Sequence, residues 1–241
     1  MTACQLEFEI ACAAMTLPLV DMLKGENPLL KTSEPKAVSL DAIGQSVFKR
    51  EIPTKRKFQD LRRKDSAVKA VKDLERDGFE LYGLTKGQFS LTDLIEAIIE
   101  KTGPAQLDIS TWTAAQTDVG RMLEFLGSGK VTGCRWLVDM SFVRRCPALV
   151  ATIRREFGDG SLRVTRTHAK FVTITNDDWQ VALRSSMNLN QNPRLESFEV
   201  GHDPELCGFL SGVFDDVFKR QKRALADCST VEISRWFNAK G

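Results

Sequence analysis

The sequence predicts an α/β fold in which helices flank a mixed β-sheet, preceded by a basic helical extension. From residue 79 onward, short apolar segments typical of strands alternate with segments of helical period. Two adjacent strand-like segments flank the turn Asn176-Asp177-Asp178, which indicates a β-hairpin. Alternating strands and helices favour parallel pairing, whereas a hairpin is antiparallel. We therefore expect a mixed sheet with helices on both faces.

The expected elements of this domain follow one another closely along the chain. The first helix has Ser90 or Thr92 as its N-cap and ends at Gly103-Pro104. The strands are expected over 79–84, 107–111, 134–138, 162–167, 169–175 and 179–184, and the helices over 92–101, 114–126, 147–157 and 204–222. This order gives two parts: an N-terminal extension over 1–78 and an α/β domain over 79–241.

The extension divides into a weakly patterned arm over 1–45 and a basic segment over 49–77. The basic segment has eleven Lys and Arg against six Asp and Glu, a local surplus of +5 in a chain whose net charge is +2. Phe58, Leu61, Val68, Val71 and Leu74 recur at helical spacing, so we expect a helical pair with a basic outer face. The residues expected to contact nucleic-acid phosphates are Lys49, Arg50, Lys55, Arg56, Lys57, Arg62, Arg63 and Lys64. The alternative is an ordinary solvated helix face.

Composition excludes several other classes of protein. The 241 residues are 42% hydrophobic and 27% charged, as in soluble globular proteins. Six cysteines show no Cys-x-x-Cys spacing and only two histidines are present, so no zinc cluster, other metal or cofactor is expected. The chain has neither a secretory signal nor an apolar run of membrane-spanning length. We expect a reduced, cytoplasmic protein that does not bind membranes.

Polar side chains gather at the ends of the predicted hairpin. His168 and Lys170 are two residues apart, so they project from the same face of an extended chain. The returning strand ends in Ser186-x-Asn188, and the hairpin brings the two pairs together. Lys170 supplies positive charge, Ser186 and Asn188 supply hydrogen bonds, and His168 can attack phosphorus or move a proton. This set of side chains suits a phosphate group, although ordinary hairpin polar residues are the alternative.

Together these residues resemble the signature of the phospholipase D superfamily, which is His-x-Lys, four residues, Asp, and then Gly-Ser-x-Asn. The resemblance covers residues of about 80–220 and implies a histidine nucleophile, with the lysine and asparagine holding the phosphate. It also implies a glutamate that orients the histidine. Glu199 stands at the matching distance after Asn188, and Glu196 is the second candidate.

The chain departs from the signature at two positions. Thr175 stands where the family has its Asp, and the nearest carboxylates are Asp177 and Asp178 in a longer turn. Ser185 replaces the glycine. The missing Asp bears more on activity than on fold.

The resemblance also implies an assembly. A single motif provides one histidine, whereas the family's chemistry needs a nucleophile and a leaving-group acid. We therefore expect a homodimer with one composite site across a two-fold axis.

These observations favour a metal-independent phosphodiesterase or endonuclease acting on nucleic acid, with DNA preferred. A non-catalytic DNA-binding protein that uses the site as a phosphate grip is the main alternative, and a lipid phosphodiesterase ranks last. Core packing is the simpler interpretation of Trp112 and Trp179, with base stacking as the alternative.

Overall fold

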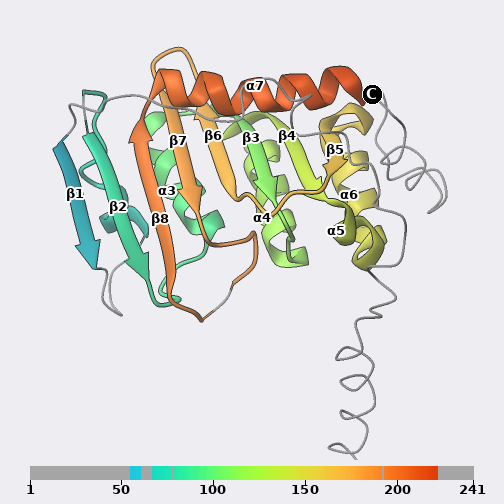
Figure 1. The fold of residues 1–241 in the computed structure, drawn as a ribbon, viewed down its shortest axis with the longest axis horizontal. Helices are drawn as coiled ribbons and strands as arrows, with labels where there is room; N and C mark the ends of the chain where they lie inside the picture. Colours follow the sequence, from blue (N-terminus) through green and yellow to red (C-terminus); the bar gives the residue numbers. More distant parts are fainter. Residues whose placement is uncertain (1–54, 61–66, 78, 192, 222–241) are drawn as a thin grey trace, which may run out of the picture. The chain divides into compact units, whose positions relative to one another are not determined.

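The computed structural model describes residues 55–60, 67–77, 79–191 and 193–221, which include an eight-stranded β-sheet (Figure 1). The expected arm over 1–45 and the basic residues Lys49, Arg50, Arg62, Arg63 and Lys64 lie outside the described residues. No helix in the described part of the chain is long and apolar enough to cross a membrane.

The sheet is mixed, as the sequence predicts. Its strand order is β1-β2-β8-β7-β6-β3-β4-β5. The strands are β1 (Lys55–Asp60), β2 (Phe79–Thr85), β3 (Ala105–Thr111), β4 (Val131–Asp139), β5 (Leu162–Thr165), β6 (Phe171–Thr175), β7 (Gln180–Ser185) and β8 (Glu196–His202). Strands β3, β4 and β5 pair in parallel, as do β1 and β2, whereas β6, β7 and β8 form an antiparallel centre. The predicted hairpin is the β6–β7 pair.

Helices cover both faces of the sheet. They are α2 (Ala67–Val71), α3 (Leu91–Thr102), α4 (Gln116–Gly127), α5 (Met140–Arg145), α6 (Pro147–Phe157) and α7 (Pro204–Arg220), with a 3-10 turn η2 (Asp159–Ser161). Helices α3 and α4 lie behind the sheet in Figure 1, and α7 crosses the front near one end of the strands. Leu210 and Phe214 of α7 pack on the sheet through Ala182 and Leu137.

The expected cap of α3 is present. The Asp93 amide donates to Ser90 Oγ at 3.1 Å, and the Ser90 amide donates to the Asp93 carboxylate at 2.6 Å, which completes a capping box. Burial alone would raise the pKa of Asp93, but hydrogen bonds from Ser90 and Arg121 lower it. The first helix therefore begins where the sequence predicts.

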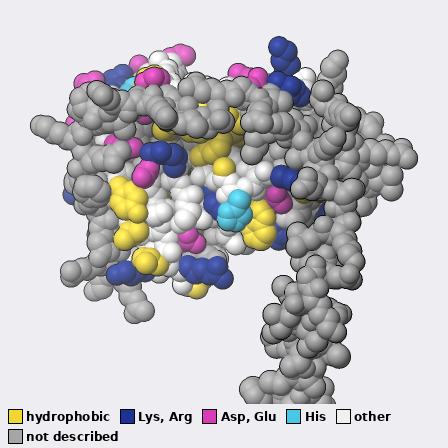
Figure 2. All heavy atoms as spheres, in the orientation of Figure 1, with side chains coloured by type: hydrophobic (Ala, Val, Ile, Leu, Met, Phe, Trp, Pro, Cys, Tyr) yellow, Lys and Arg dark blue, Asp and Glu magenta, His cyan; other side chains and the backbone are white. Residues whose placement is uncertain are grey.

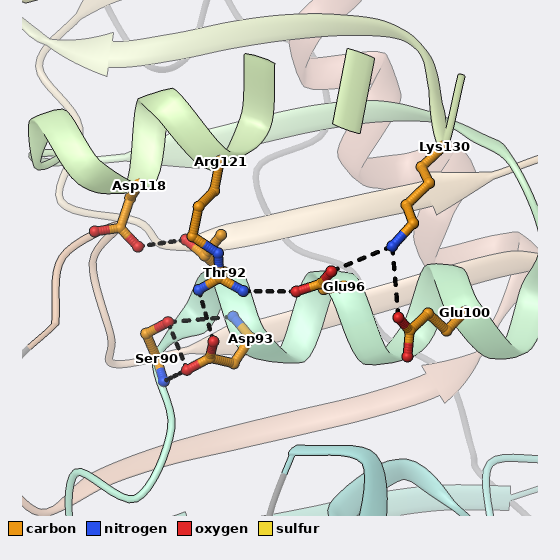
Figure 3. A network of polar contacts seen from close by, with 8 residues as sticks. All are labelled: Ser90, Thr92, Asp93, Glu96, Glu100, Asp118, Arg121 and Lys130. Atoms are coloured by element: carbon orange, nitrogen blue, oxygen red, sulfur yellow. Dashed lines mark hydrogen bonds and ion pairs between the residues drawn. The ribbon is translucent and has the colours of Figure 1, made fainter. Parts of the chain in front are cut away.

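A polar network joins α3 to α4 and to the start of β4 on the rear layer (Figure 3). Arg121 of α4 binds Asp93 at 2.6 Å and Glu96 at 2.7 Å. Lys130 binds Glu96 at 3.2 Å, and Thr92 donates to Asp118 at 2.6 Å. These carboxylates bind partners within the rear layer, so they stabilise the fold and are not part of the site on the front face.

The prediction of a helical pair is wrong in its first half. Residues Lys55–Asp60 form strand β1, which pairs in parallel with β2 at the edge of the sheet. Phe58 and Leu61 are too few to define a period, and a neighbouring strand supplies backbone hydrogen bonds that a short isolated helix lacks. The second half is helical as α2, but Val68 is 55% exposed and does not join Val71 and Leu74 in the core. The sheet thus extends upstream of residue 79.

Two elements of the domain were not expected from the sequence. Strand β8 inserts between β2 and β7, and short helix α5 precedes α6. Phe198 and Val200 of β8 are both 1% exposed and lie on the same face of the strand, so one buried apolar face holds β8 in place, while Ser197 and Glu199 between and beside them are partly exposed. The position of β8 decides the surroundings of the two candidate glutamates.

Candidate active site

The segment that carries His168 lies directly before β6 and is held by two neighbouring strands. The Asp139 carboxylate, at the end of β4, accepts from the Thr167 amide at 3.1 Å. Ser110 Oγ, near the end of β3, donates to the Ala169 carbonyl at 3.0 Å. The backbone on either side of His168 is therefore fixed by hydrogen bonds to the ends of β3 and β4.

His168 and Lys170 are in contact, as their spacing predicts. Lys170 Nζ lies 3.1 Å from Nδ1 and 3.3 Å from Nε2 of His168, and donates to the His168 carbonyl at 2.9 Å. The expected strand began at residue 169, whereas β6 begins at Phe171, so both residues lie on the approach to the strand. Because an ammonium group only donates, the imidazole nitrogen that faces it accepts.

Ser185 ends strand β7 beside this pair, and Ser186 follows directly after the strand. The Ser185 amide donates to the Lys170 carbonyl at 3.1 Å, which closes the hairpin at the end that carries His168. The Ser186 amide donates to the Ser197 carbonyl at 3.0 Å, and the Ser197 amide donates back to Ser186 Oγ at 3.0 Å. Ser186 is thus joined to β8 as well as to the hairpin.

Glu196 is the carboxylate nearest to this group. Ser186 Oγ donates a hydrogen bond to the Glu196 carboxylate. Partial burial lowers the pKa of Lys170, and the negative charge of Glu196 opposes that shift. Glu196 therefore acts on both the hydroxyl and the ammonium group of the site.

Glu199 has a different partner. It forms an ion pair with Arg184, its cross-strand neighbour in β7, and Arg184 also binds Glu80 of β2 at 3.0 Å. Among the described residues, neither Glu199 nor Glu196 forms a hydrogen bond with His168. The spacing in the sequence thus leaves two candidate glutamates, both on β8. They differ in their partners, because Glu196 binds Ser186 whereas Glu199 binds Arg184.

A cleft of about 420 Å³ opens on this face between the strand ends and α7. Its lining combines a lysine, an arginine, a carboxylate and serines with aromatic and apolar groups. The lining residues are Tyr82, Ala169, Lys170, Phe171, Arg184, Ser185, Ser186, Ser197, Phe198, Glu199 and Leu210. Figure 2 shows this face, on which histidine, basic, acidic and hydrophobic side chains surround a polar centre. Lys170, Ser186 and Glu199 thus share one cleft, with exposed His168 in contact with Lys170.

Asn188 lies on the segment that leaves β7. Leu189, the next residue, forms a bridge with Ala114, and the Ala115 amide donates to the Leu189 carbonyl at 2.7 Å. Asn188 Oδ1 is buried and has no hydrogen-bond partner in the described structure. A buried amide oxygen without a partner is costly, so this atom is a candidate for binding a ligand group or water.

The position where the resemblance implies an Asp lies far from His168 along the hairpin. Thr175 ends β6 at the turn, and Asp178 beyond it forms an ion pair with Arg76 at 3.6 Å. Asp177 and Asp178 are both in the turn, at the opposite end of β6 from Lys170. In the described ranges, no cluster of three or more His, Cys, Asp or Glu side chains is arranged to hold a metal ion.

The basic residues expected to bind nucleic acid are only partly within the described chain. Lys55, Arg56 and Lys57 begin edge strand β1, next to Phe79, Glu80 and Leu81 of β2. The segment after β1, over 61–66, lies outside the described residues. The first described residues of the basic segment thus lie on a sheet edge and not on a helix.

The sequence did not place three residues beside His168, and of these only Trp112 was considered, for core packing or base stacking. The Trp112 ring lies 5.6 Å from the His168 ring between centroids, and the Arg145 guanidinium lies over Trp112. Asp139 holds the Thr167 amide. Asp139 is the N-cap of α5, and it was missed because that short helix was not expected. The Trp112 and Arg145 contacts join residues far apart in sequence and have no local signal.

No family model and no curated protein sequence matches the chain. It resembles several solved structures in fold. Three of them are NucT from Helicobacter pylori (12% identity, TM-score 0.43, 58% of this chain and 96% of that one), a phosphatidylserine synthase from Haemophilus influenzae Rd KW20 (16%, 0.42, 65% and 43%) and TrmBL2, an archaeal chromatin protein (9%, 0.37, 58% and 52%). Because all three TM-scores are below 0.5, we base the functional proposal on the side chains of the site.

Proposed function

We propose that the chain is a metal-independent phosphodiesterase of the phospholipase D type that cleaves nucleic acid with His168 as nucleophile. The observation that carries the proposal is the contact of Lys170 Nζ with the His168 ring, 3.1 Å from Nδ1, beside a cleft that also holds Ser186. The contact places an imidazole, which can act as a nucleophile through a ring nitrogen, directly beside an ammonium group. The same ammonium group can neutralise a phosphate bound at that position.

The proposed reaction has two displacements. A His168 ring nitrogen attacks phosphorus, a phosphorus–nitrogen bond forms, and the bond to the leaving oxygen breaks as that oxygen takes a proton from a second histidine. Water then attacks phosphorus, returns a proton to the second histidine, and releases His168. In a two-fold dimer the second histidine is His168 of the other copy, so each copy supplies the same residue in a different role.

Ser186, Asn188 and a glutamate complete the proposed site. Asn188 has a buried amide oxygen without a described partner, which leaves its side chain available to a ligand. Of the two glutamates we favour Glu196 for tuning the site, because it binds Ser186 and acts on the charge of Lys170. Glu199, which is paired with Arg184, remains the alternative for orienting His168.

A second candidate function is nucleic-acid binding without hydrolysis. Two observations favour it: Thr175 stands in place of the Asp that the resemblance implies, and Ser186 Oγ is already engaged by Glu196. In this case Lys170 and its neighbours would grip a backbone phosphate without cutting the strand. A lipid substrate has no comparable support on this face.

The test measures cleavage of labelled single- and double-stranded DNA, RNA and bis(4-nitrophenyl) phosphate in excess EDTA, with phospholipid vesicles as a further substrate. We expect the wild type to cleave nucleic acid and His168→Asn to be inactive with unchanged folding. His202→Asn is the matched control, because the other histidine lies at the end of β8, where it accepts from the Gln180 amide. Turnover by His168→Asn at the wild-type rate contradicts the nucleophile, and tight binding without cleavage by the wild type favours the second candidate.

A further inference from the structure

Three side chains from separate elements are in contact on one side of the site. The Trp112 ring, directly after β3, lies 5.6 Å from the His168 ring, with 56° between the planes. The guanidinium carbon of Arg145, at the end of α5, lies 4.6 Å from the Trp112 ring centroid. The indole thus connects a cation to the proposed nucleophile.

Arg145 differs from three arginines of the fold that are neutralised by acidic side chains. Arg121, Arg135 and Arg184 each bind carboxylates at short range. Arg145 is exposed, and its one described interaction is with the Trp112 ring. A guanidinium held by its face against an aromatic ring keeps its N–H donors free at the edge. Within the described chain, no acidic side chain neutralises it.

The position of Arg145 is fixed relative to His168 by more than the ring contacts. Asp139 Oδ1 accepts from the Ser141 amide at 2.8 Å, which caps α5, while Oδ2 accepts from the Thr167 amide at 3.1 Å. One carboxylate therefore ties the helix that ends in Arg145 to the residue before His168. A cation held in this way is pre-organised, so less side-chain entropy is lost when an anion binds.

We propose that Arg145, held by Trp112, binds a backbone phosphate next to the phosphodiester at His168. The inference rests on the proposed function and identifies the substrate as a strand with more than one phosphate. The guanidinium edge matches two phosphate oxygens, which a lysine at the same place would not do as well. Trp112 acts as a positioning residue, because it orients both Arg145 and the His168 ring without touching the reacting bond.

A simpler role for Arg145 is to complement the dipole at the C-terminal end of α5. Arg144 precedes it in the same last turn, is also exposed, and has no described contact with Trp112. Arg144→Gln therefore removes the same charge from the same turn without disturbing the ring contact, and serves as the matched control for Arg145→Gln.

The experiment measures binding of a fluorescent single-stranded oligonucleotide by anisotropy across a salt series in EDTA, at a temperature that suppresses cleavage. We expect Arg145→Gln to raise the dissociation constant about 5- to 10-fold and to flatten the log–log salt slope by about 0.7, the loss of one phosphate contact. Arg145→Lys should keep most of the slope and lose part of the affinity. Trp112→Leu should resemble Arg145→Gln, and Arg144→Gln should resemble the wild type.

A kinetic arm separates this inference from the proposed function. The value of kcat/KM is compared for the oligonucleotide and for bis(4-nitrophenyl) phosphate, which has a single phosphate. We expect Arg145→Gln to lose at least about fivefold more on the oligonucleotide, the range of one charge-assisted contact. The inference is overturned if Arg145→Gln loses kcat/KM equally on both substrates, or if Arg144→Gln loses as much as Arg145→Gln. An unchanged salt slope in Arg145→Gln overturns it as well. Absence of cleavage by the wild type contradicts the proposed function alone, because binding still tests Arg145.

Discussion

Lys170 is partly buried and lines the cleft. Its side chain contacts the His168 imidazole, and its carbonyl accepts from the Ser185 amide at the end of β7. Its pKa is lowered chiefly by burial, so it loses its proton at a lower pH than an exposed lysine does. The protonated form is the one that attracts phosphate. Binding should therefore decline as pH rises through the lowered pKa of Lys170.

Lys170→Ala should remove this charge and lower the rate by several orders of magnitude. A phosphoryl group without its counter-charge loses about 3–5 kcal/mol of transition-state stabilisation. The measurements are kcat/KM and the affinity for vanadate from pH 7 upward. The wild type should lose affinity at alkaline pH and Lys170→Ala should show no such decline. Vanadate binding by the variant as tight as that of the wild type means that the phosphate site is elsewhere.

Substitution of Asp139 should lower the activity far more than it lowers the stability of the fold. It caps α5 through the Ser141 amide and holds the Thr167 amide beside His168. Asp139→Ala should cost about 1 kcal/mol as a lost cap, and lower the Tm by about 2–4 °C. The rate should fall much further, because the backbone before His168 loses its anchor. Thermal unfolding measures the loss of stability, and kcat/KM measures the loss of activity. If the activity falls only in proportion to the stability, Asp139 is a purely structural residue.

At the scale of elements, the sequence predicts those whose pattern is local. Helix α3 (Leu91–Thr102) has as its N-cap Ser90, one of the two residues that the sequence offered, and the β6–β7 hairpin flanks the turn at Asn176. Strand β1 could not be predicted, because its hydrogen bonds come from β2 and its own apolar residues define no period. Strand β8 was missed for a related reason: it is buried between β2 and β7, and both neighbours are set by topology.

The same distinction holds for the site. His168 and Lys170 are two residues apart, and the hairpin brings Ser186 near them, so local pattern is sufficient. Counting residues cannot decide which of the two glutamates acts at the site. Glu199 pairs with Arg184 because β7 and β8 are neighbours in a register that sets these two residues opposite each other. Trp112 contacts His168, and Arg145 contacts Trp112, through the order of β3, β4 and β6. Contacts that cross strands thus require the sheet before they can be assigned.

Strand β1 gives the element-scale prediction. Lys55, Arg56 and Lys57 stand on an edge strand in a segment with a surplus of +5, and clustered basic residues bind polyanions without regard to sequence. If four residues of the segment contact phosphates, the log–log salt slope on duplex DNA should be about −3.6. Replacing these three residues by alanine should flatten the slope and weaken binding to a similar extent for all DNA sequences. Turnover of bis(4-nitrophenyl) phosphate should fall far less.

The outcomes of that substitution distinguish two roles of β1. A loss of equal size on DNA and on the small diester, with a lower Tm, means that these residues support the sheet edge. An unaltered salt slope means that nucleic acid binds elsewhere on the chain. Basic residues on an edge strand also discourage pairing with other sheets, so the oligomeric state of the variant is recorded alongside binding.

At the scale of the whole molecule, one site supplies one histidine in a reaction that uses two. His168 is exposed on a face that α7 covers only at one end. An isologous interface on this face would bring two copies of His168 to one phosphate without a second motif. The dimer is therefore a proposal that follows from the chemistry, and it can be tested without knowing the natural substrate.

The test mixes wild-type chains with His168→Asn chains under conditions in which subunits exchange. If each site needs both copies of His168, only pairs of two wild-type chains are active. An equal mixture should then retain about a quarter of the activity of the undiluted wild type, because random pairing leaves that fraction of dimers intact. Independent sites would retain half. Analytical ultracentrifugation checks that the variant dimerises and exchanges subunits like the wild type. Arg144→Gln chains keep His168, so mixing them with wild-type chains is the control that should leave the activity undiminished. A linear loss with the fraction of His168→Asn chains, in dimers shown to exchange, means that each chain works alone and that the leaving-group acid must be sought within the same copy.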